Sequence, residues 1–197
     1  MRYSTEHKAA TRERVLKEAA KEIRERGPDN IAVAGVMARV GLTHGGFYAH
    51  FASKDALVRE AIGTMFADAR KRTERIDANG DPRAVLRAYV DFYLSPAHRD
   101  SRDRGCPLPT LSGDFARSQS ATRARFGAGV EGIASRLAMP LAALGYADAQ
   151  AESHALLAQL VGGVALARAV GDPALSDAML ADTHASIVAR YGLESAQ

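Results

Sequence analysis

Residues 33–57 constrain this chain more than any other stretch, because two short helical patterns lie on either side of one glycine. Before Gly41 apolar side chains recur at helical spacing, and after it Phe47 and Phe51 lie four residues apart. Gly41 tolerates the left-handed conformation that ends a helix, and Thr43 can cap the helix that follows. The pattern therefore predicts a helix-turn-helix whose second helix, at about residues 43–50, enters the major groove of DNA.

The polar side chains of this second helix lie opposite its two phenylalanines. Thr43 and His44 stand at the helix N-terminus, which usually meets bases, whereas Tyr48 and His50 can donate hydrogen bonds to phosphates. A solvated polar face would show the same pattern. We expect no metal at His44 and His50, because side chains six residues apart point in different directions and no third ligand accompanies them.

Two consecutive glycines, Gly45 and Gly46, stand in the first turns of the same helix. Each costs about 1 kcal/mol relative to alanine inside a helix. The missing side chains would let the backbone approach DNA closely, and the alternative is that the glycines only extend the turn.

The composition favours an all-α chain. Of its 197 residues 47% are hydrophobic, and no long alternating strand pattern occurs. We expect a DNA-binding domain at residues 1–52 and a helical domain for ligand binding and dimerisation at residues 53–197. The net charge of +3 lies entirely in residues 1–60, which hold 11 Lys or Arg against 8 Asp or Glu. Because the longest apolar stretch contains Gln159 and Arg168 and the N-terminus has no signal-peptide pattern, we expect a cytoplasmic protein.

Helical spacing and capping residues predict the elements of the second domain. A long helix leaves the helix-turn-helix and carries the chain into this domain, so a tilt of its far end would move the recognition helix. A proline inside a later helix, Pro140, is expected to kink it. The predicted helices span about residues 53–76, 82–94, 120–144, 148–170 and 173–190, and another opens near residue 106.

The last two predicted helices carry apolar stripes that can pair two copies of the chain. Two such hairpins form a four-helix bundle across a two-fold axis, and burial against their own chain is the alternative. The expected dimer interface consists of Leu156, Leu160, Gly163, Val164, Ala167, Met179, Thr183 and Ile187.

Apolar and aromatic side chains of the middle helices predict a chamber for a small molecule. No carboxylate pair or cationic cluster dominates the sequence there, which favours an apolar or aromatic ligand, and no cofactor is expected. Each residue taken singly could be plain core. The expected lining consists of Met65, Phe66, Tyr89, Phe92, Tyr93, Cys106, Leu108 and Phe126.

Cys106 is the only cysteine, so the chain has no intramolecular disulfide. It follows Arg104 and precedes a helix, and both features favour the thiolate. An enzyme that pairs Cys106 with His98 or His154 is disfavoured, because no activating set of residues is visible.

Residues 11–60 resemble the DNA-binding domain of the tetracycline-repressor (TetR) family of bacterial transcriptional regulators. The resemblance rests on the run GLTHGGFYAHFASKDAL and the preceding TRERVLKEAAKEIRERG. It implies a homodimer that binds a palindromic operator, most simply a repressor released by a small molecule. In such a protein Tyr48, His50 and Lys54 contact phosphates, whereas Thr43 and His44 face the bases. A nucleoid-type DNA binder without a ligand is a further alternative.

Two positions depart from the family's pattern. Where the family usually has a Ser or Thr that caps the helix before the turn, this chain has Ala32, and we expect Asn30 to replace that cap. Where a larger side chain is usual, it has Gly46, so specificity would depend more on DNA shape. The sequence Gly-Cys-Pro-Leu at residues 105–108 also resembles a branch of the family in which some members sense electrophiles or oxidants, which gives a thiol-sensing repressor as the alternative function.

Overall fold

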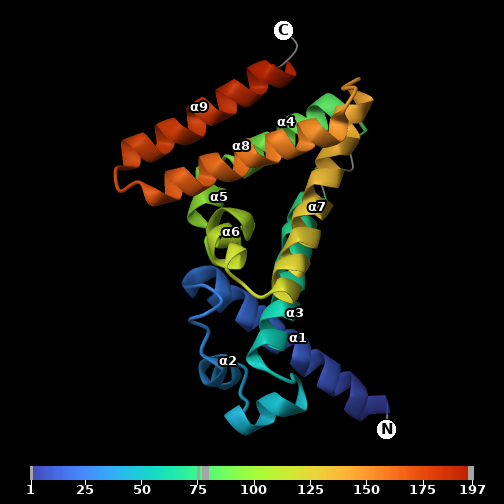
Figure 1. Ribbon diagram of the computed structural model, residues 1–197, viewed down its shortest axis with the longest axis vertical. Helices are drawn as coiled ribbons and strands as arrows, with labels where there is room; N and C mark the ends of the chain where they lie inside the picture. The colour runs from blue at the N-terminus through green and yellow to red at the C-terminus, as the bar shows by residue number, and fades with distance from the viewer. Residues whose placement is uncertain (1, 75, 77–79, 195–197) are drawn as a thin grey trace.

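The three N-terminal helical elements form the end of the molecule that lies farthest from the C-terminus (Figure 1). They are α1 (Arg2–Arg26), α2 (Val33–Arg39) and the short 3-10 helix η1 (His44–Ala49). The computed structural model describes residues 2–74, 76 and 80–194, and the side chains among these from residue 6 onward. Within these residues all regular structure is helical, which confirms the all-α class.

A long helix, α3 (Lys54–Thr73), connects this end to the rest of the chain and packs on α1 and on α7 (Ser120–Ala143). The Ser53 hydroxyl caps α3 by accepting a hydrogen bond from the Ala56 N–H at 3.1 Å. The predicted helix at residues 53–76 is therefore confirmed, although α3 ends at Thr73. Helix α7 continues through Pro140 to Ala143, and α4 (Pro82–Tyr93), α5 (Pro96–Asp100) and α6 (Leu108–Ala116) lie between α3 and α7 in the chain.

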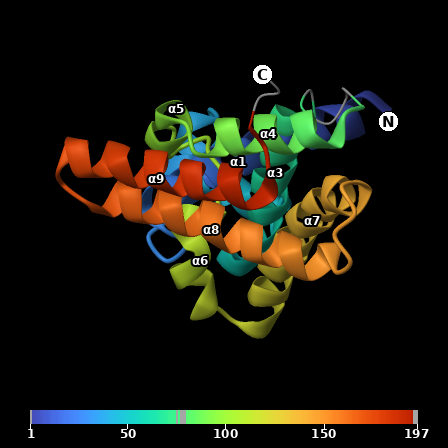
Figure 2. The ribbon, with the colours of Figure 1, turned by 90° about the horizontal axis from the view of Figure 1, so that it is seen from above.

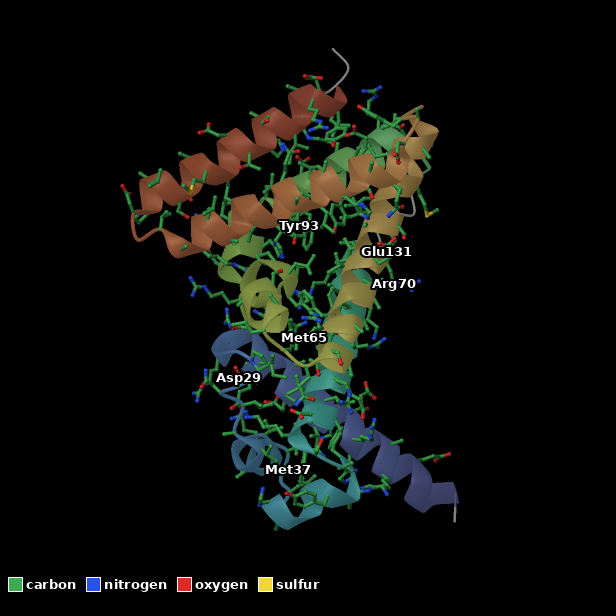
Figure 3. The ribbon with its side chains drawn as sticks, viewed as in Figure 1. Asp29, Met37, Met65, Arg70, Tyr93 and Glu131 are labelled. Atoms are coloured by element: carbon green, nitrogen blue, oxygen red, sulfur yellow. The ribbon has the colours of Figure 1, made fainter. Side chains whose placement is uncertain are left out.

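The last two helices, α8 (Ala149–Ala169) and α9 (Pro173–Tyr191), lie side by side across the opposite end of the molecule (Figure 2). One apolar core runs through the whole chain. Figure 3 labels three of its members, Met37 on α2, Met65 on α3 and Tyr93 on α4. Among the described residues, no helix combines the length and the apolar character needed to cross a membrane.

The apolar stripes predicted to pair two chains are instead mostly buried inside one chain. Helix α8 packs on α7 and on α9, where Gly163 lies against Thr183, and α9 also packs on α4. The predicted interface is therefore wrong for the buried positions, because atoms that already pack inside one chain cannot face a second. These positions are Leu156, Leu160, Gly163, Val164, Ala167 and Ile187, while Met179 and Thr183 are half-buried.

Candidate nucleic-acid interface and ligand cavity

The segment expected to be the second helix of the helix-turn-helix forms the single 3-10 element η1. The Gly46 N–H bonds to the Thr43 carbonyl at 3.1 Å and the His50 N–H to the Phe47 carbonyl at 2.9 Å, so these bonds have the 3-10 spacing. The two glycines lower the helix propensity of this short segment. Thr43 stands at the N-cap position, but its hydroxyl makes no capping bond, which corrects the expected cap. Gly41 has φ of +77°, as the turn requires.

The residues of η1 divide into a buried and an exposed face, as the sequence predicts. Phe47 and Phe51 stack at 5.6 Å between ring centroids and are buried. On the outside Thr43 and His44 are exposed, and Tyr48 exposes 68% of its surface. The Tyr48 ring makes edge contacts with Phe47 and His44, at 5.2 and 6.4 Å between centroids, and its exposed remainder is available to a partner.

His50 and Lys54 lie at the end of η1 and the start of α3. His50 is half-buried, its Nδ1 atom has no hydrogen-bond partner, and burial together with the nearby Lys8 and Arg12 lowers its pKa. The Lys54 ammonium donates to the Asp29 carbonyl at 2.7 Å, which uses one of its three hydrogens.

The N–H of Ala32, the N-cap residue of α2, has a partner that the sequence did not indicate, although the N-cap position itself has no side-chain capping bond. The buried Glu22 of α1 accepts a hydrogen bond from the Ala32 N–H at 3.0 Å and pairs with Arg39. The expected substitute, Asn30, bonds instead to the Arg26 carbonyl at the end of α1. That expectation was wrong, because the Asn30 amide is bonded to α1 and the N-cap position of α2 has no side-chain capping bond.

The two glycines of η1 are not required by packing. A Cβ atom at Gly46 would lie 3.8 Å from Thr43 Oγ1 and 3.9 Å from Met37 Cε, and one at Gly45 would lie 4.0 Å from Thr43 Oγ1. These are ordinary contact distances, and neither glycine has a positive φ. Nothing inside the chain therefore demands glycine at either position.

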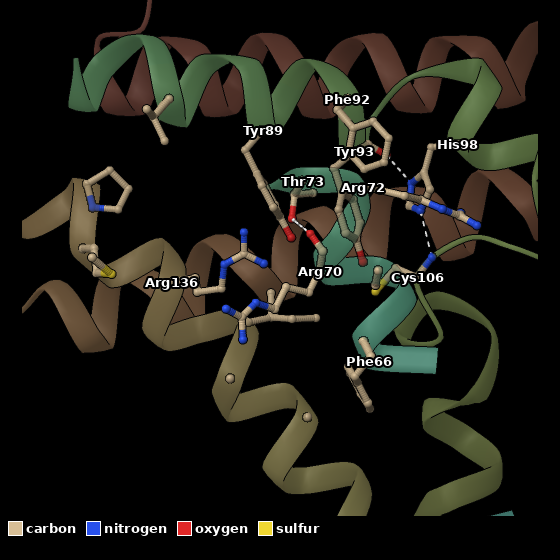
Figure 4. Close-up of a pocket in the computed structure, with 18 of the residues that line it drawn as sticks. Phe66, Arg70, Arg72, Thr73, Tyr89, Phe92, Tyr93, His98, Cys106 and Arg136 are labelled. Carbon is tan, nitrogen blue, oxygen red and sulfur yellow. Dashed lines mark hydrogen bonds between the residues drawn. The ribbon is translucent and has the colours of Figure 1, made fainter. Parts of the chain in front are cut away.

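A cavity of about 810 Å³ opens between α3, α4 and α7 (Figure 4). Five residues predicted to line it do so: Phe66, Tyr89, Phe92, Tyr93 and Cys106. Three others do not, and their prediction as lining was wrong. Met65, Leu108 and Phe126 are buried in the surrounding core, because sequence periodicity cannot separate a side chain that faces a cavity from one that faces the next helix.

The cavity is more basic than the sequence suggested. Four arginines lie among its lining residues, and none of the lining residues in the described part of the chain is Asp or Glu. Arg70 and Arg72 come from α3, and Arg125 and Arg136 from α7. This corrects the expectation that no cationic cluster is present, which failed because the two helices bring together charges that are more than 50 residues apart.

A polar cluster closes the inner end of the cavity. His98 Nδ1 lies 2.7 Å from the Tyr93 carbonyl, while His98 Nε2 accepts the backbone N–H of Cys106 at 3.1 Å. The N–H must therefore be on Nδ1. Burial lowers the pKa of His98 to about 4, so the ring is neutral near pH 7.

Cys106 is buried, with 7% of its surface exposed. Burial raises the pKa of its thiol and outweighs the opposing effects of Tyr93, the Leu108 N–H and two arginines. The expected thiolate is therefore not favoured, since Arg104 points to solvent and pairs with Asp103. The alternative Cys–His pairs are not formed either, because His98 bonds to the Cys106 backbone and His154 contacts Glu131 and Gln150.

Comparisons with known proteins agree with this architecture. Residues 15–61 match the family described as bacterial regulatory proteins, tetR family. The chain is 36% identical over 66 residues to the uncharacterized HTH-type transcriptional regulator YdgC of Bacillus subtilis, which covers 34% of each chain. It is 31% identical over 97 residues to the HTH-type transcriptional repressor Rv1474c of Mycobacterium tuberculosis, which covers 49% of this chain and 48% of that protein. The chain therefore spans only a third to a half of the length of these relatives.

Similar solved structures extend over nearly the whole chain. A TetR-family transcriptional regulator from Agrobacterium tumefaciens superposes with a TM-score of 0.77 at 20% identity, covering 93% of this chain and 98% of that one. The reduced form of Escherichia coli NemR gives 0.78 at 19% identity, covering 90% and 95%. A TetR transcriptional regulator from Chloroflexus aurantiacus gives 0.78 at 22%, covering 93% and 96%. These likenesses show a shared fold.

Proposed function

Because the chain belongs to the TetR family of bacterial transcriptional regulators, we propose that it is a homodimeric repressor that leaves a palindromic operator when a small molecule enters the cavity. In this proposal residues 1–52 bind DNA, residues 53–197 bind the ligand and the second subunit, and the protein acts in the cytoplasm. Thr43 and His44 face bases, Tyr48, His50 and Lys54 contact phosphates, and Gly45 and Gly46 allow close approach of the backbone.

One observation carries the proposal: α3 belongs to both sites. It begins at Lys54 beside η1, packs on α1, and lines the cavity with Gly63, Phe66 and Arg70. A ligand that shifts α3 therefore also shifts η1 relative to the second subunit. Only a ligand that binds better to the conformer unable to span the operator can release the DNA.

Dimerisation through the outward side of α8 and α9 fits their exposed surface. Leu166 and Leu175 expose 57% and 46% of their surfaces, and exposed alanines surround them. Light scattering should show a dimer that Leu166→Asp converts to monomers. Met139→Asp is the matched control, because Met139 is 72% exposed but lies on α7. A monomeric wild-type chain, or equal effects of the two variants, would count against this interface.

The central test is a binding titration against the DNA that flanks the protein's own gene, at several salt concentrations. Specific binding should exceed binding to random sequence by roughly 10³-fold or more. Lys54→Gln should reduce the slope of log K against log salt by up to about two for the dimer, since it removes at most one phosphate contact from each of the two subunits. Arg104→Gln removes an equal charge away from η1 and should leave the slope unchanged. Flanking DNA that binds no better than random sequence would instead favour the nucleoid-type alternative.

A second candidate function is thiol sensing. One observation favours it: Cys106 lines the cavity, so a small electrophile that enters could reach its sulfur. Cys106→Ser should then abolish DNA release by quinones. Unchanged release in that variant would exclude thiol sensing.

A further inference from the structure

The ring of Phe66 lies directly on the backbone of α7 at Gly129. Phe66 projects from α3, and both residues line the cavity (Figure 4). A Cβ atom at Gly129 would lie 2.5 Å from Phe66 Cζ and closer still to two other carbons of the ring. These distances are far shorter than a van der Waals contact between carbon atoms. The ring therefore fills the space that any side chain at residue 129 would need.

This contact, and not the backbone conformation, is what requires glycine at residue 129. Gly129 lies inside α7 and has no positive φ. Two neighbouring glycines of the same helix, Gly127 and Gly132, would meet no atom within 4 Å if they carried a Cβ. Because glycine is a weaker helix former than alanine, residue 129 gives up helix stability for the close approach of the ring.

A second aromatic residue of α7 borders the same space. Phe126 lies three residues before Gly129, on the same face of α7. Its ring meets the Phe66 ring edge to face at 5.5 Å between centroids, and it also packs on Phe115 of α6 at 4.7 Å. Phe126 and Gly129 thus form a slot for the Phe66 ring, and the ring fits this slot only at one spacing of α3 and α7.

Another close contact between the same two helices involves a flexible side chain. Gly63 of α3 lies against the end of the Arg125 side chain, whose Cζ atom would be 3.3 Å from a Cβ at Gly63. The end of an arginine can rotate away about several bonds, whereas a phenyl ring is a rigid plane with few rotatable bonds. A group added at Gly129 must therefore turn the ring into another rotamer or separate the two helices.

We propose that Phe66 is a positioning residue that couples the cavity to DNA binding. With its ring on Gly129 it lets α3 lie close to α7, and a ligand that occupies this space makes the ring push α3 away from α7. This inference rests on the proposed function, in which a shift of α3 releases DNA. The ring borders the cavity, where a ligand can reach it, and α3 begins at Lys54 beside η1. A ligand that fills the cavity also blocks the space into which the ring could otherwise turn.

The test needs no knowledge of the ligand, because Gly129→Ala places a methyl group where the ring lies. Operator binding is titrated on the DNA that flanks the protein's own gene. Gly129→Ala should weaken it about 5- to 150-fold, the usual range of coupling between two sites. Gly127→Ala is the matched control on the same helix, since residue 127 does not line the cavity, and it should leave the affinity unchanged. Gly63→Ala should weaken binding less than Gly129→Ala, because Arg125 can move aside.

A second substitution separates this role from simple damage to the fold. Phe66→Ala removes the ring, so the double variant Phe66→Ala/Gly129→Ala should regain most of the lost operator affinity. If Gly129→Ala acted only by destabilising the chain, the loss of another apolar side chain would weaken binding further. By calorimetry Gly129→Ala should have a Tm about 2–12 °C below that of Gly127→Ala, the cost of overpacking. This difference should vanish when both substitutions are made in the Phe66→Ala variant.

Two results would overturn the role of Phe66 and leave the proposed function standing: equal operator affinity of Gly129→Ala and Gly127→Ala, or a double variant that binds no better than Gly129→Ala. A wild-type chain that binds the flanking DNA no better than random sequence contradicts the proposed function and, with it, the regulatory role of Phe66. The Tm comparison then still shows whether the ring and Gly129 are in contact.

Discussion

Glu22 is expected to help hold the helix-turn-helix in place through its charge. Its carboxylate is buried and connects α1 to the start of α2 through the Ala32 N–H and to the end of α2 through Arg39. Glu22→Gln keeps an oxygen that can accept from Ala32 but loses the negative charge. Glu22→Ala loses both interactions.

The expected magnitudes follow from these contacts. A hydrogen bond to a charged group contributes about 1.5–3 kcal/mol and a neutral one about 0.5–1.5 kcal/mol, so Glu22→Gln should lower the free energy of unfolding by about 1 kcal/mol. The contribution of Arg39 is discounted because half of its side chain is exposed. Glu22→Ala should cost about 2–3 kcal/mol. For a chain of this size 1 kcal/mol corresponds to a decrease in Tm of about 2–4 °C, which calorimetry resolves.

The matched control is Glu18→Gln, because Glu18 pairs with the same arginine at 3.2 Å but is more exposed and caps nothing. It should cost less than about 0.5 kcal/mol. If Glu22→Gln were as stable as the wild type at pH 7, or no worse than Glu18→Gln, the stabilising role assigned to the Glu22 carboxylate would be refuted.

The effect of Glu22 also has a defined pH dependence. Burial raises the pKa of Glu22, but the Ala32 N–H and Arg39 outweigh burial and the net pKa is lowered from 4.5. A lowered folded-state pKa means that the stabilisation is complete above the unfolded-state pKa and is lost as the pH falls through the folded-state value. The difference between wild type and Glu22→Gln should therefore persist from pH 7 to about pH 5 and disappear in stronger acid.

Three further outcomes are expected. Gly46→Ala should leave Tm unchanged or slightly higher, because its Cβ fits without a clash, but should weaken operator binding in a gel-shift assay; unchanged affinity would show that the glycine only extends the turn. Native Cys106 should react with iodoacetamide at pH 7.5 at least about tenfold more slowly than the urea-unfolded chain, because burial raises its thiol pKa; equal rates would contradict this. Because the pKa of His98 is lowered to about 4, the free energy of unfolding measured by urea denaturation should fall as the pH decreases from 6.5 toward 4. His98 contributes at most about 1.4 kcal/mol per pH unit to this fall, and His98→Asn should lose that contribution. An unchanged pH dependence of stability in the variant would contradict the neutral buried ring.

The sequence predicted the helices and the helix-turn-helix well, because the relevant signals are local. Proline and aspartate at Asp81–Pro82 and Asp172–Pro173 start α4 and α9, as their chemistry predicts. The alternation of Phe47 and Phe51 with polar side chains correctly identified the buried and exposed faces of η1. Each of these signals acts within one or two turns of a helix, so no knowledge of the rest of the chain is needed.

The candidate sites were predicted less completely, because their residues come together only in the folded chain. One stripe on α7 has helical spacing and could have been noticed in the sequence; it consists of Arg125, Gly129, Gly132 and Arg136. Nothing local in the sequence shows that this stripe faces the same cavity as Arg70 of α3. Likewise the periodicity of Leu156 and Leu160 correctly marked an apolar face, yet that face packs inside its own chain.

The amino-acid sequence by itself therefore determined the helical class, the approximate bounds of the long helices and the exposed polar face of η1, since these depend on side chains that are neighbours along one helix. Only the tertiary structure decided which apolar faces are buried, that Glu22 of α1 accepts the N–H of Ala32 at the start of α2, and that the cavity is basic. The physical reason is distance along the chain. Burial and electrostatic interactions depend on which helices pack together, and in this protein the decisive partners lie from ten to more than 60 residues apart.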